Sequence, residues 1–155
     1  MLKRCFLFGH RDASEVLLPE LIRVVTAHVA EEQVGEFIVG SYGGFDRLAA
    51  RAVAAVKKRY PQIRLVQLQP YHPTVRAVPL PEGFDEGWYP EGMESVPPRL
   101  AIVRANRHAI DYADYIIAYV WHAASNARNE LEYAQKRPAL SITLIQRDGL
   151  SSRRL

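Results

Sequence analysis

Short apolar runs alternate along this chain with segments whose apolar residues recur at helical spacing. The runs predict strands over residues 3–8, 37–39, 63–68, 115–121 and 140–145. The run 115–121 is apolar without alternation, which is typical of a central parallel strand covered on both faces. The pattern therefore indicates a sheet with a buried interior.

Amphipathic segments lie between the predicted strands. Asp12 and Glu15 have the spacing of a capping box, and Tyr60-Pro61 is a stop signal. The predicted helices run from this capping pair through Val29, from Phe45 to Tyr60, from Pro98 to Tyr112, and from Ser125 or Asn126 to Lys136. Strands and helices thus follow one another in β-α order.

This order predicts an α/β fold, namely one doubly wound Rossmann-like domain over residues 1–155 with a five-stranded, mainly parallel sheet. A length of 155 residues with 48% hydrophobic residues suits a single domain with its own core. Between about residues 70 and 98, seven prolines predict a long loop without regular structure. Loops of this kind serve as lids, binding loops or partner contacts.

Charge and cysteine content narrow the function classes. The formal net charge of +3 suits an anionic partner, but Lys57, Lys58 and Arg59 fall at a helix end and Arg153 and Arg154 near the chain end. We therefore expect solvated charges rather than a nucleic-acid patch. The single cysteine, Cys5, excludes an intramolecular disulfide and favours a reducing, cytoplasmic setting. The apolar runs are far shorter than the ~20 residues of a membrane span.

In a doubly wound sheet, ligands bind outside the carboxyl ends of the strands, where the strand order reverses. Gly9, His10 and Arg11 follow the first predicted strand directly. A glycine there lets a ligand approach the backbone, and an arginine binds phosphate or carboxylate with two hydrogen bonds. The alternative is a strand-end turn with Arg11 in solvent.

The glycine-rich segment after the second strand is the second candidate loop. It contains Gly40, Ser41, Gly43, Gly44, Phe45 and Asp46. It has neither the P-loop spacing nor the dinucleotide fingerprint, but paired glycines before a helix predict an anion or ribose cradle. We expect a β-branched residue at Gly44 to obstruct the ligand more than it disturbs folding. Asp46 either accepts a sugar hydroxyl or only complements the helix dipole.

The third candidate loop runs from Trp121 to Glu130. Ser125 and Asn126 are predicted as helix caps, whose neighbouring N–H groups also suit a phosphate. Glu130 lies one turn into the helix, and Asn106 on the preceding helix is a further candidate for the same cleft. The histidines show no ligand-like pairing, so we predict no metal, and we identify no cofactor.

Several of these segments together resemble a known family. They are Phe8-Gly9-His10-Arg11, the strand 37–40 leading to Gly43-Gly44-Phe45-Asp46, and Ala105-Asn106-Arg107 before the run 110–119. In this order they resemble the YpsA-type branch of the SLOG superfamily, whose members include cytokinin-activating phosphoribohydrolases and the DNA-processing proteins of transformation. The resemblance implies a Rossmann-like domain that binds nucleotide-like small molecules. It also implies a homo-oligomer, because relatives often self-associate.

One segment departs from the family pattern. After the fourth predicted strand the family usually has a glycine pair and a small residue, whereas this chain has Ser125-Asn126-Ala127. Glu130 stands where the family often has threonine, and it resembles the acidic residue of the phosphoribohydrolase loop. The full glycine motif of that loop is absent.

Three functions remain open. The first is a binding module, or sensor, for a nucleotide derivative. The second is an N-glycosidic hydrolase or transferase acting on nucleoside monophosphates, in which Glu130 or Asp46 stabilises an oxocarbenium ion. The third is a single-stranded nucleic-acid binder that uses Tyr71, Trp88 and Tyr89.

Overall fold

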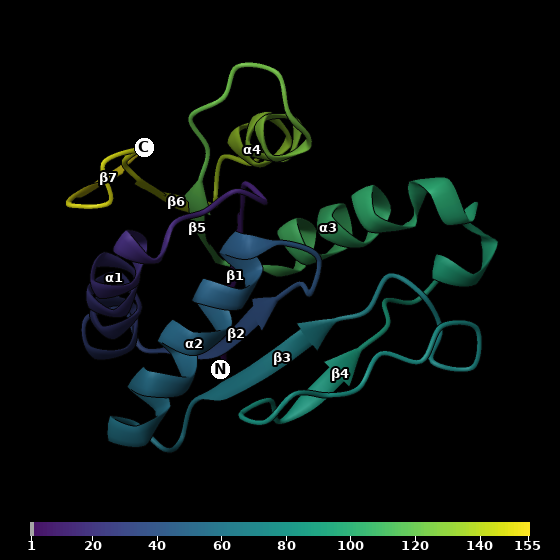
Figure 1. Ribbon diagram of the computed structural model, residues 1–155, viewed down its shortest axis with the longest axis horizontal. Helices are drawn as coiled ribbons and strands as arrows, with labels where there is room; N and C mark the ends of the chain where they lie inside the picture. Colours follow the sequence, from purple (N-terminus) through teal and green to yellow (C-terminus); the bar gives the residue numbers. More distant parts are fainter. Residues whose placement is uncertain (1) are drawn as a thin grey trace.

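A computed structural model describes residues 2–155 and contains one sheet flanked by helices on both faces (Figure 1). Its strands are β1 (Lys3–Gly9), β2 (Val34–Val39), β3 (Arg64–Leu68), β4 (Glu86–Trp88), β5 (Tyr115–Tyr119), β6 (Ser141–Ile145) and β7 (Ser152–Arg154). The strand order is β4-β3-β2-β1-β5-β6-β7, and every pair except β6–β7 is parallel. The predicted α/β class with a mainly parallel sheet is confirmed, with seven strands instead of five.

Within residues 2–155, four α-helices cover the sheet. They are α1 (Leu18–Ala30), α2 (Gly44–Arg59), α3 (Ala101–Tyr112) and α4 (Asn126–Gln135). Helices α1 and α2 enclose one apolar core against one face of the sheet, and α3 and α4 enclose a second core against the other (Figure 1). Alternate residues of the strands supply the two cores: Leu7 lies in the first, and Phe6 and Phe8 lie in the second.

The proline-rich segment contains regular structure, which corrects the expectation of a continuous loop. Strand β4 pairs with β3 between Pro81 and Pro90, in a stretch that has no proline to interrupt the pairing. Asp85 anchors it, because its carboxylate accepts the N–H of Leu65 at 2.8 Å and pairs with Lys57. Short 3-10 turns follow at η2 (Met93–Ser95) and η3 (Pro98–Leu100).

The second unpredicted strand is β7, close to the end of the chain. Gly149, at φ +75°, turns the chain back so that β7 runs antiparallel to β6. Arg154, which we expected in a solvated tail, pairs with Glu32 at 3.1 Å. Lys57 and Arg154 thus both have carboxylate partners.

The start of the first helical segment also differs from the prediction. Ser14, rather than Asp12, is the capping residue, and its hydroxyl accepts the N–H of Val16 at 3.3 Å. A 3-10 turn, η1 (Glu15–Leu17), precedes α1, whose first turn contains Pro19. Asp12 is left free to line the cleft described below.

Candidate functional site

The order in which the chain adds strands to the sheet reverses between β1 and β5. A cleft of about 290 Å³ opens at the carboxyl ends of these two strands. From β1 the chain first builds outward through β2, β3 and β4 and then returns to the other side of β1 as β5. The loops after β1 and β5 therefore diverge toward opposite faces of the sheet, which leaves a crevice between them.

His10 ties the loops after β1 and β5 together. Its side chain is buried, and its Nε2 accepts the backbone N–H groups of Trp121 at 2.8 Å and His122 at 3.1 Å. Burial lowers the pKa of His10, and the nearby His122 and Arg128 lower it further. The ring is therefore neutral, with the proton on Nδ1, and it holds the rim of the cleft in place.

The paired glycines after β2 are needed for packing against the chain itself. A Cβ atom on Gly44 would lie 2.4 Å from the carbonyl oxygen of Arg11, and the N–H of Gly44 donates to that oxygen at 2.8 Å. The N–H of Phe45 donates to the carbonyl of His10 at 3.3 Å. At the amino end of α2 these two N–H groups thus donate to protein carbonyls, so they are not free donors for an anion.

Phe45 and Gly9 extend the same packing below the loop. Phe45 is fully buried, and its ring stacks on that of Tyr119 with centroids 6.1 Å apart. A Cβ atom on Gly9 would lie 2.7 Å from the ring of Phe45 and 2.9 Å from the Tyr119 carbonyl oxygen. These contacts place the start of α2 directly against the ends of β1 and β5.

Asp46 is the residue of the α2 amino end that reaches the cleft. Its Oδ2 accepts the N–H of Tyr42 at 2.9 Å, and a Cβ atom on Gly40 would lie 2.9 Å from the same oxygen. Desolvation raises the pKa of Asp46 to about 6, although the Tyr42 N–H and the charge of Arg11 act in the opposite direction. The carboxyl therefore titrates near neutral pH.

Glu130 lines the other side of the cleft from α4. It is only 2% exposed, and within residues 2–155 neither of its carboxyl oxygens has a hydrogen-bond partner. Burial raises the pKa of Glu130 to about 7, against the effect of the Arg107 charge. A buried polar group without a partner is costly, so this carboxyl is available to a ligand.

The amino end of α4 is more open than that of α2. Ser125 caps the helix, and its hydroxyl accepts the N–H of Arg128 at 3.0 Å. The N–H groups of Asn126 and Ala127 have no partner in the part of the chain that the structure describes. Both residues line the cleft. This end of the cleft thus combines unused donors with the unused acceptors of Glu130.

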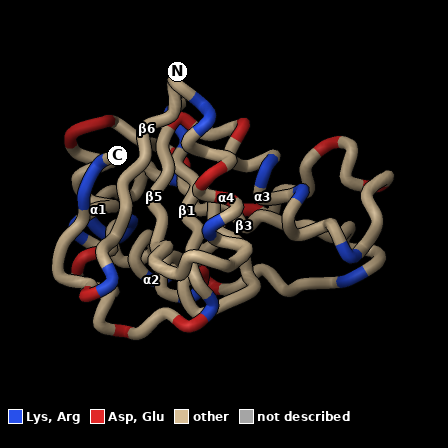
Figure 2. Tube along the Cα trace, turned by 90° about the horizontal axis from the view of Figure 1, so that it is seen from above, with Lys and Arg blue, Asp and Glu red and all other residues tan. Residues whose placement is uncertain are grey.

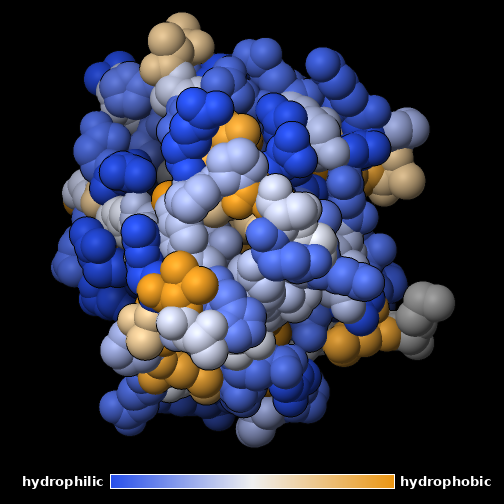
Figure 3. Space-filling model, turned by 90° about the vertical axis from the view of Figure 1, so that its right-hand side faces the viewer, coloured by the Kyte–Doolittle hydropathy of each residue, from blue (hydrophilic) through white to orange (hydrophobic). Residues whose placement is uncertain are grey.

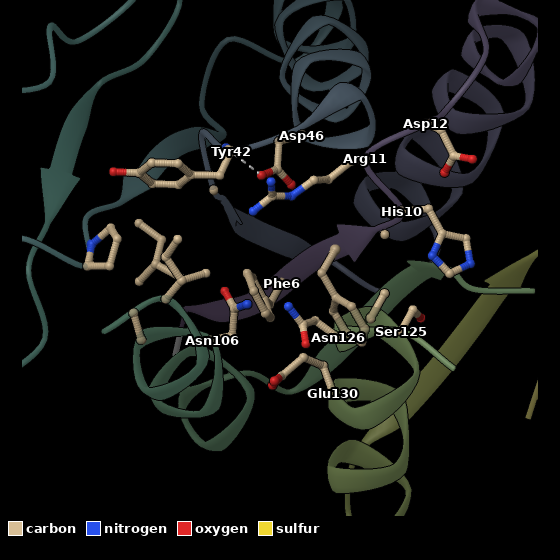
Figure 4. A pocket seen from close by; sticks show the side chains of 18 of the residues that line it. Phe6, His10, Arg11, Asp12, Tyr42, Asp46, Asn106, Ser125, Asn126 and Glu130 are labelled. Atoms are coloured by element: carbon tan, nitrogen blue, oxygen red, sulfur yellow. Dashed lines mark hydrogen bonds between the residues drawn. The ribbon is translucent and has the colours of Figure 1, made fainter. Parts of the chain in front are cut away.

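Figure 4 shows the two walls facing each other across the cleft. Tyr42, Asp46 and Arg11 lie on the α2 side, whereas Asn106, Asn126 and Glu130 come from α3 and α4 (Figure 4). The predicted residues brought together here are Gly9, His10, Arg11, Gly40, Asp46, Asn106, Ser125, Asn126 and Glu130. Those outside the lining are Ser41, Gly43, Gly44 and Phe45. The binding roles of all of them stay predictions.

Sequence reasoning missed the apolar lining of the cleft, and it did not single out Tyr42 within the glycine-rich segment. Ile102 and Ala105 precede Asn106 by four residues and one, so a helical wheel that placed Asn106 would also have placed Ile102 on its face. Phe6 and Phe8 share one face of β1 by strand alternation. No group of three or more His, Cys, Asp or Glu side chains suited to a metal ion occurs in residues 2–155.

Comparisons with known proteins identify the fold. No protein-family model and no curated protein matches the sequence. DNA processing protein A (DprA) from Streptococcus pneumoniae is similar with a TM-score of 0.68 and 18% identity, over 97% of this chain and 53% of that one. DprA from Helicobacter pylori, in a study of its single-stranded DNA binding mode, has a TM-score of 0.57 and 16% identity, over 90% and 64%.

A third solved structure has the same architecture. The molybdenum cofactor binding protein from Rippkaea orientalis is similar with a TM-score of 0.60 and 12% identity, over 92% of this chain and 76% of that one. The chain spans about half the length of the pneumococcal protein. At these identities the likeness shows a DprA-like Rossmann fold. No helix within residues 2–155 is both long and apolar enough to cross a membrane.

Proposed function

We propose that the chain binds a nucleotide or a nucleotide-derived ligand in the cleft between Asp46 and Glu130, as a member of the YpsA-type branch of the SLOG superfamily. The observation that carries the proposal is the state of Glu130, a buried carboxyl with two unpartnered oxygens beside two unpartnered N–H groups. A small molecule that bears both donors and acceptors satisfies these groups together, whereas an apolar ligand satisfies none.

In this proposal the donors and the acceptors that line the cleft bind different parts of the ligand. Arg11 and the free N–H groups of Asn126 and Ala127 supply donors for phosphate, as helix amino ends commonly do. The carboxyls of Asp46 and Glu130 accept hydrogen bonds from hydroxyl or amino groups. Phe6 and Phe8 supply apolar surface for a planar base.

Thermal unfolding against nucleoside mono-, di- and triphosphates and ADP-ribose tests the proposal. A ligand at 100 times its Kd stabilises the folded state by about 2.7 kcal/mol, which raises the Tm of a chain of this size by roughly 5–10 °C. The double variant D46N/E130Q, if it remains folded by circular dichroism, should lose most of the shift. No shift with any nucleotide at millimolar concentration would overturn the proposal.

A second candidate is cleavage of an N-glycosidic bond. Two carboxyl groups whose pKa values are raised toward neutrality line one cleft, and such pairs serve glycosyl transfer. One carboxyl would stabilise the oxocarbenium ion, while the other, in its protonated form, would give a proton to the departing base and then take one from the water that attacks the anomeric carbon. Chromatography of free base released from nucleoside monophosphates is the assay. Under this candidate E130Q or D46N lowers release by ~100-fold or more while affinity stays within a few fold.

Single-stranded DNA is a third candidate, favoured by the DprA fold. In this chain two of the aromatic residues predicted to stack on bases already contact other side chains. Trp88 packs on Tyr112 with ring centroids 4.9 Å apart, and the Arg76 guanidinium lies 4.1 Å from the Tyr71 ring centre. Basic and acidic residues are interspersed (Figure 2), and the face in Figure 3 has separate hydrophobic patches among hydrophilic residues. Anisotropy of a labelled oligothymidylate would show affinity that falls steeply with salt if this candidate holds.

A further inference from the structure

The groups around Glu130 also indicate which part of a nucleotide would bind there. Its two oxygens form a pair of adjacent acceptors that is fixed on α4 and removed from water. Such a pair is satisfied by two adjacent donors on one rigid group, as in the two parallel hydrogen bonds between a carboxylate and a guanidinium. The ligand group that reaches Glu130 should therefore present two N–H groups side by side.

The surroundings of Glu130 favour a flat ring over a sugar. Phe6, Ile102 and Ala105 line the cleft near the α3 and α4 wall, and the amides of Asn106 and Asn126 lie on the same side (Figure 4). A planar base buries its faces against apolar side chains and uses its edge for hydrogen bonds. A ribose in the same place would leave hydroxyl groups against apolar surface, at a cost in desolvation.

We propose that Glu130 binds the edge of a guanine base through the ring N–H and the neighbouring exocyclic amino group. This inference rests on the proposed nucleotide-binding function and names the base of its ligand. Pterins have the same two-donor edge, so they share the chemistry. Adenine presents a donor beside an acceptor at the corresponding edge, and it matches a protonated carboxyl group instead.

Arg107 supports the ionised form of Glu130. Its charge acts to lower the pKa of Glu130, and its Nε is itself buried without a partner within residues 2–155. In the free protein, burial keeps the pKa of Glu130 near neutrality. Two donors from guanine stabilise the carboxylate, so guanine binding at pH 7 releases protons. Adenine binding to the protonated form would take up protons.

Calorimetry with GMP, IMP and AMP at pH 7, repeated in buffers of different ionisation enthalpy, tests this inference. IMP lacks the exocyclic amino group, so it retains one donor of the pair. We expect GMP to bind ~10- to 100-fold more tightly than AMP, with IMP between them, because each donor pairs with a charged acceptor. E130Q should remove the preference. The matched control E132Q, on the exposed side of the same helix, should keep it.

The outcomes separate this inference from the function on which it rests. AMP binding as tightly as GMP, or with proton uptake, overturns the assignment of guanine and leaves nucleotide binding in place. A guanine preference that persists in folded E130Q overturns the role of Glu130. Neopterin distinguishes the two sources of the edge: affinity equal to that for GMP means that the ring edge alone is recognised, and weaker binding means that the phosphoribose contributes. Rejection of every nucleotide overturns both proposals.

Discussion

The two walls of the cleft are built from the same kind of loop, a turn from a parallel strand into a helix, but they use it differently. At α2, the N–H groups of Gly44 and Phe45 donate to carbonyls of the loop after β1. At α4, the N–H groups of Asn126 and Ala127 and the carboxyl of Glu130 have no partners in residues 2–155. The glycine-rich wall thus uses these donors within the protein, whereas the wall without glycines keeps its donors and acceptors free for a ligand.

Glycine at such a turn indicates close backbone approach, and the group that approaches need not be a ligand. In this molecule it is the carbonyl of Arg11 that lies against Gly44. Packing of α2 then positions Asp46 at the cleft. The α2 wall therefore acts mainly as a rigid support, and the α4 wall carries more of the unsatisfied hydrogen-bonding capacity.

Substitution of Gly44 by valine is expected to have the largest effect. Its Cβ would lie 2.4 Å from the Arg11 carbonyl oxygen, a backbone atom that cannot move without loss of the Gly44 hydrogen bond. We expect a loss of about 3 kcal/mol in the free energy of unfolding, measured in urea. This reverses the expectation from the sequence that a β-branched residue at Gly44 would obstruct a ligand more than it disturbs folding. Ser41→Val in the same loop should cost under about 1 kcal/mol. Equal losses in the two variants would contradict a packing role that is specific to Gly44.

Glu130→Gln should stabilise the free protein in a pH-dependent way. Burial raises the pKa of Glu130 from 4.5 to about 7, so the folded chain binds more protons than the unfolded chain between these values. The free energy of unfolding of the wild-type protein therefore falls as pH rises through this window. The variant should gain up to about 3 kcal/mol over wild type above pH 7, and little at pH 4.

Urea unfolding of both proteins at pH 4, 6 and 8 measures that difference. Glu132→Gln, at an exposed position of the same helix, should show a small and nearly constant difference. A flat profile for Glu130→Gln would mean that the carboxyl is already satisfied in the folded state. That result would contradict the inference that the α4 wall holds an unsatisfied carboxyl.

Hydrophobic patterning predicted the main strands and helices. A sheet covered on both faces requires apolar strands and helices with one apolar side, and both patterns are visible within short segments of sequence. The patterning missed β4 because three residues at a sheet edge carry no apolar period, and their pairing depends on Asp85 and Lys57 from elsewhere in the fold. The position of the cleft was predictable from the β-α order. The hydrogen bond from the Gly44 N–H to the Arg11 carbonyl was not, because it joins two loops that are distant in the sequence.

His10 joins the two walls, so its removal should affect both at an intermediate cost. His10→Leu leaves the N–H groups of Trp121 and His122 without an acceptor, and we expect a loss of about 2 kcal/mol at pH 8. His10→Gln, which keeps an acceptor on a side chain of similar reach, should lose less. Equal losses would indicate that ring packing, rather than the two hydrogen bonds, stabilises the junction.

The His10 variants should also differ in their response to acid. Burial lowers the pKa of His10 below 6.5, so the unfolded chain binds more protons below that value and the wild type loses stability as pH falls. Asp12 opposes this effect, while His122 and Arg128 add to it. His10→Leu should be less sensitive to acid than wild type in unfolding measured from pH 7 to pH 5.

The smallest effect is expected at the caps, and it tests the α4 wall most directly. Ser125→Ala removes the acceptor of the Arg128 N–H and should cost about 1 kcal/mol. Ser14→Ala removes the cap of a short, exposed turn, and a few tenths of a kcal/mol are expected there. Because the first turn of α4 holds the free N–H groups of the cleft, Ser125→Ala should also weaken nucleotide binding by a few fold, whereas Ser14→Ala should leave it unchanged. Urea unfolding and calorimetry with the same nucleotide separate the two effects, and a Ser125→Ala variant that loses stability but keeps full affinity would show that the ligand does not use the amino end of α4.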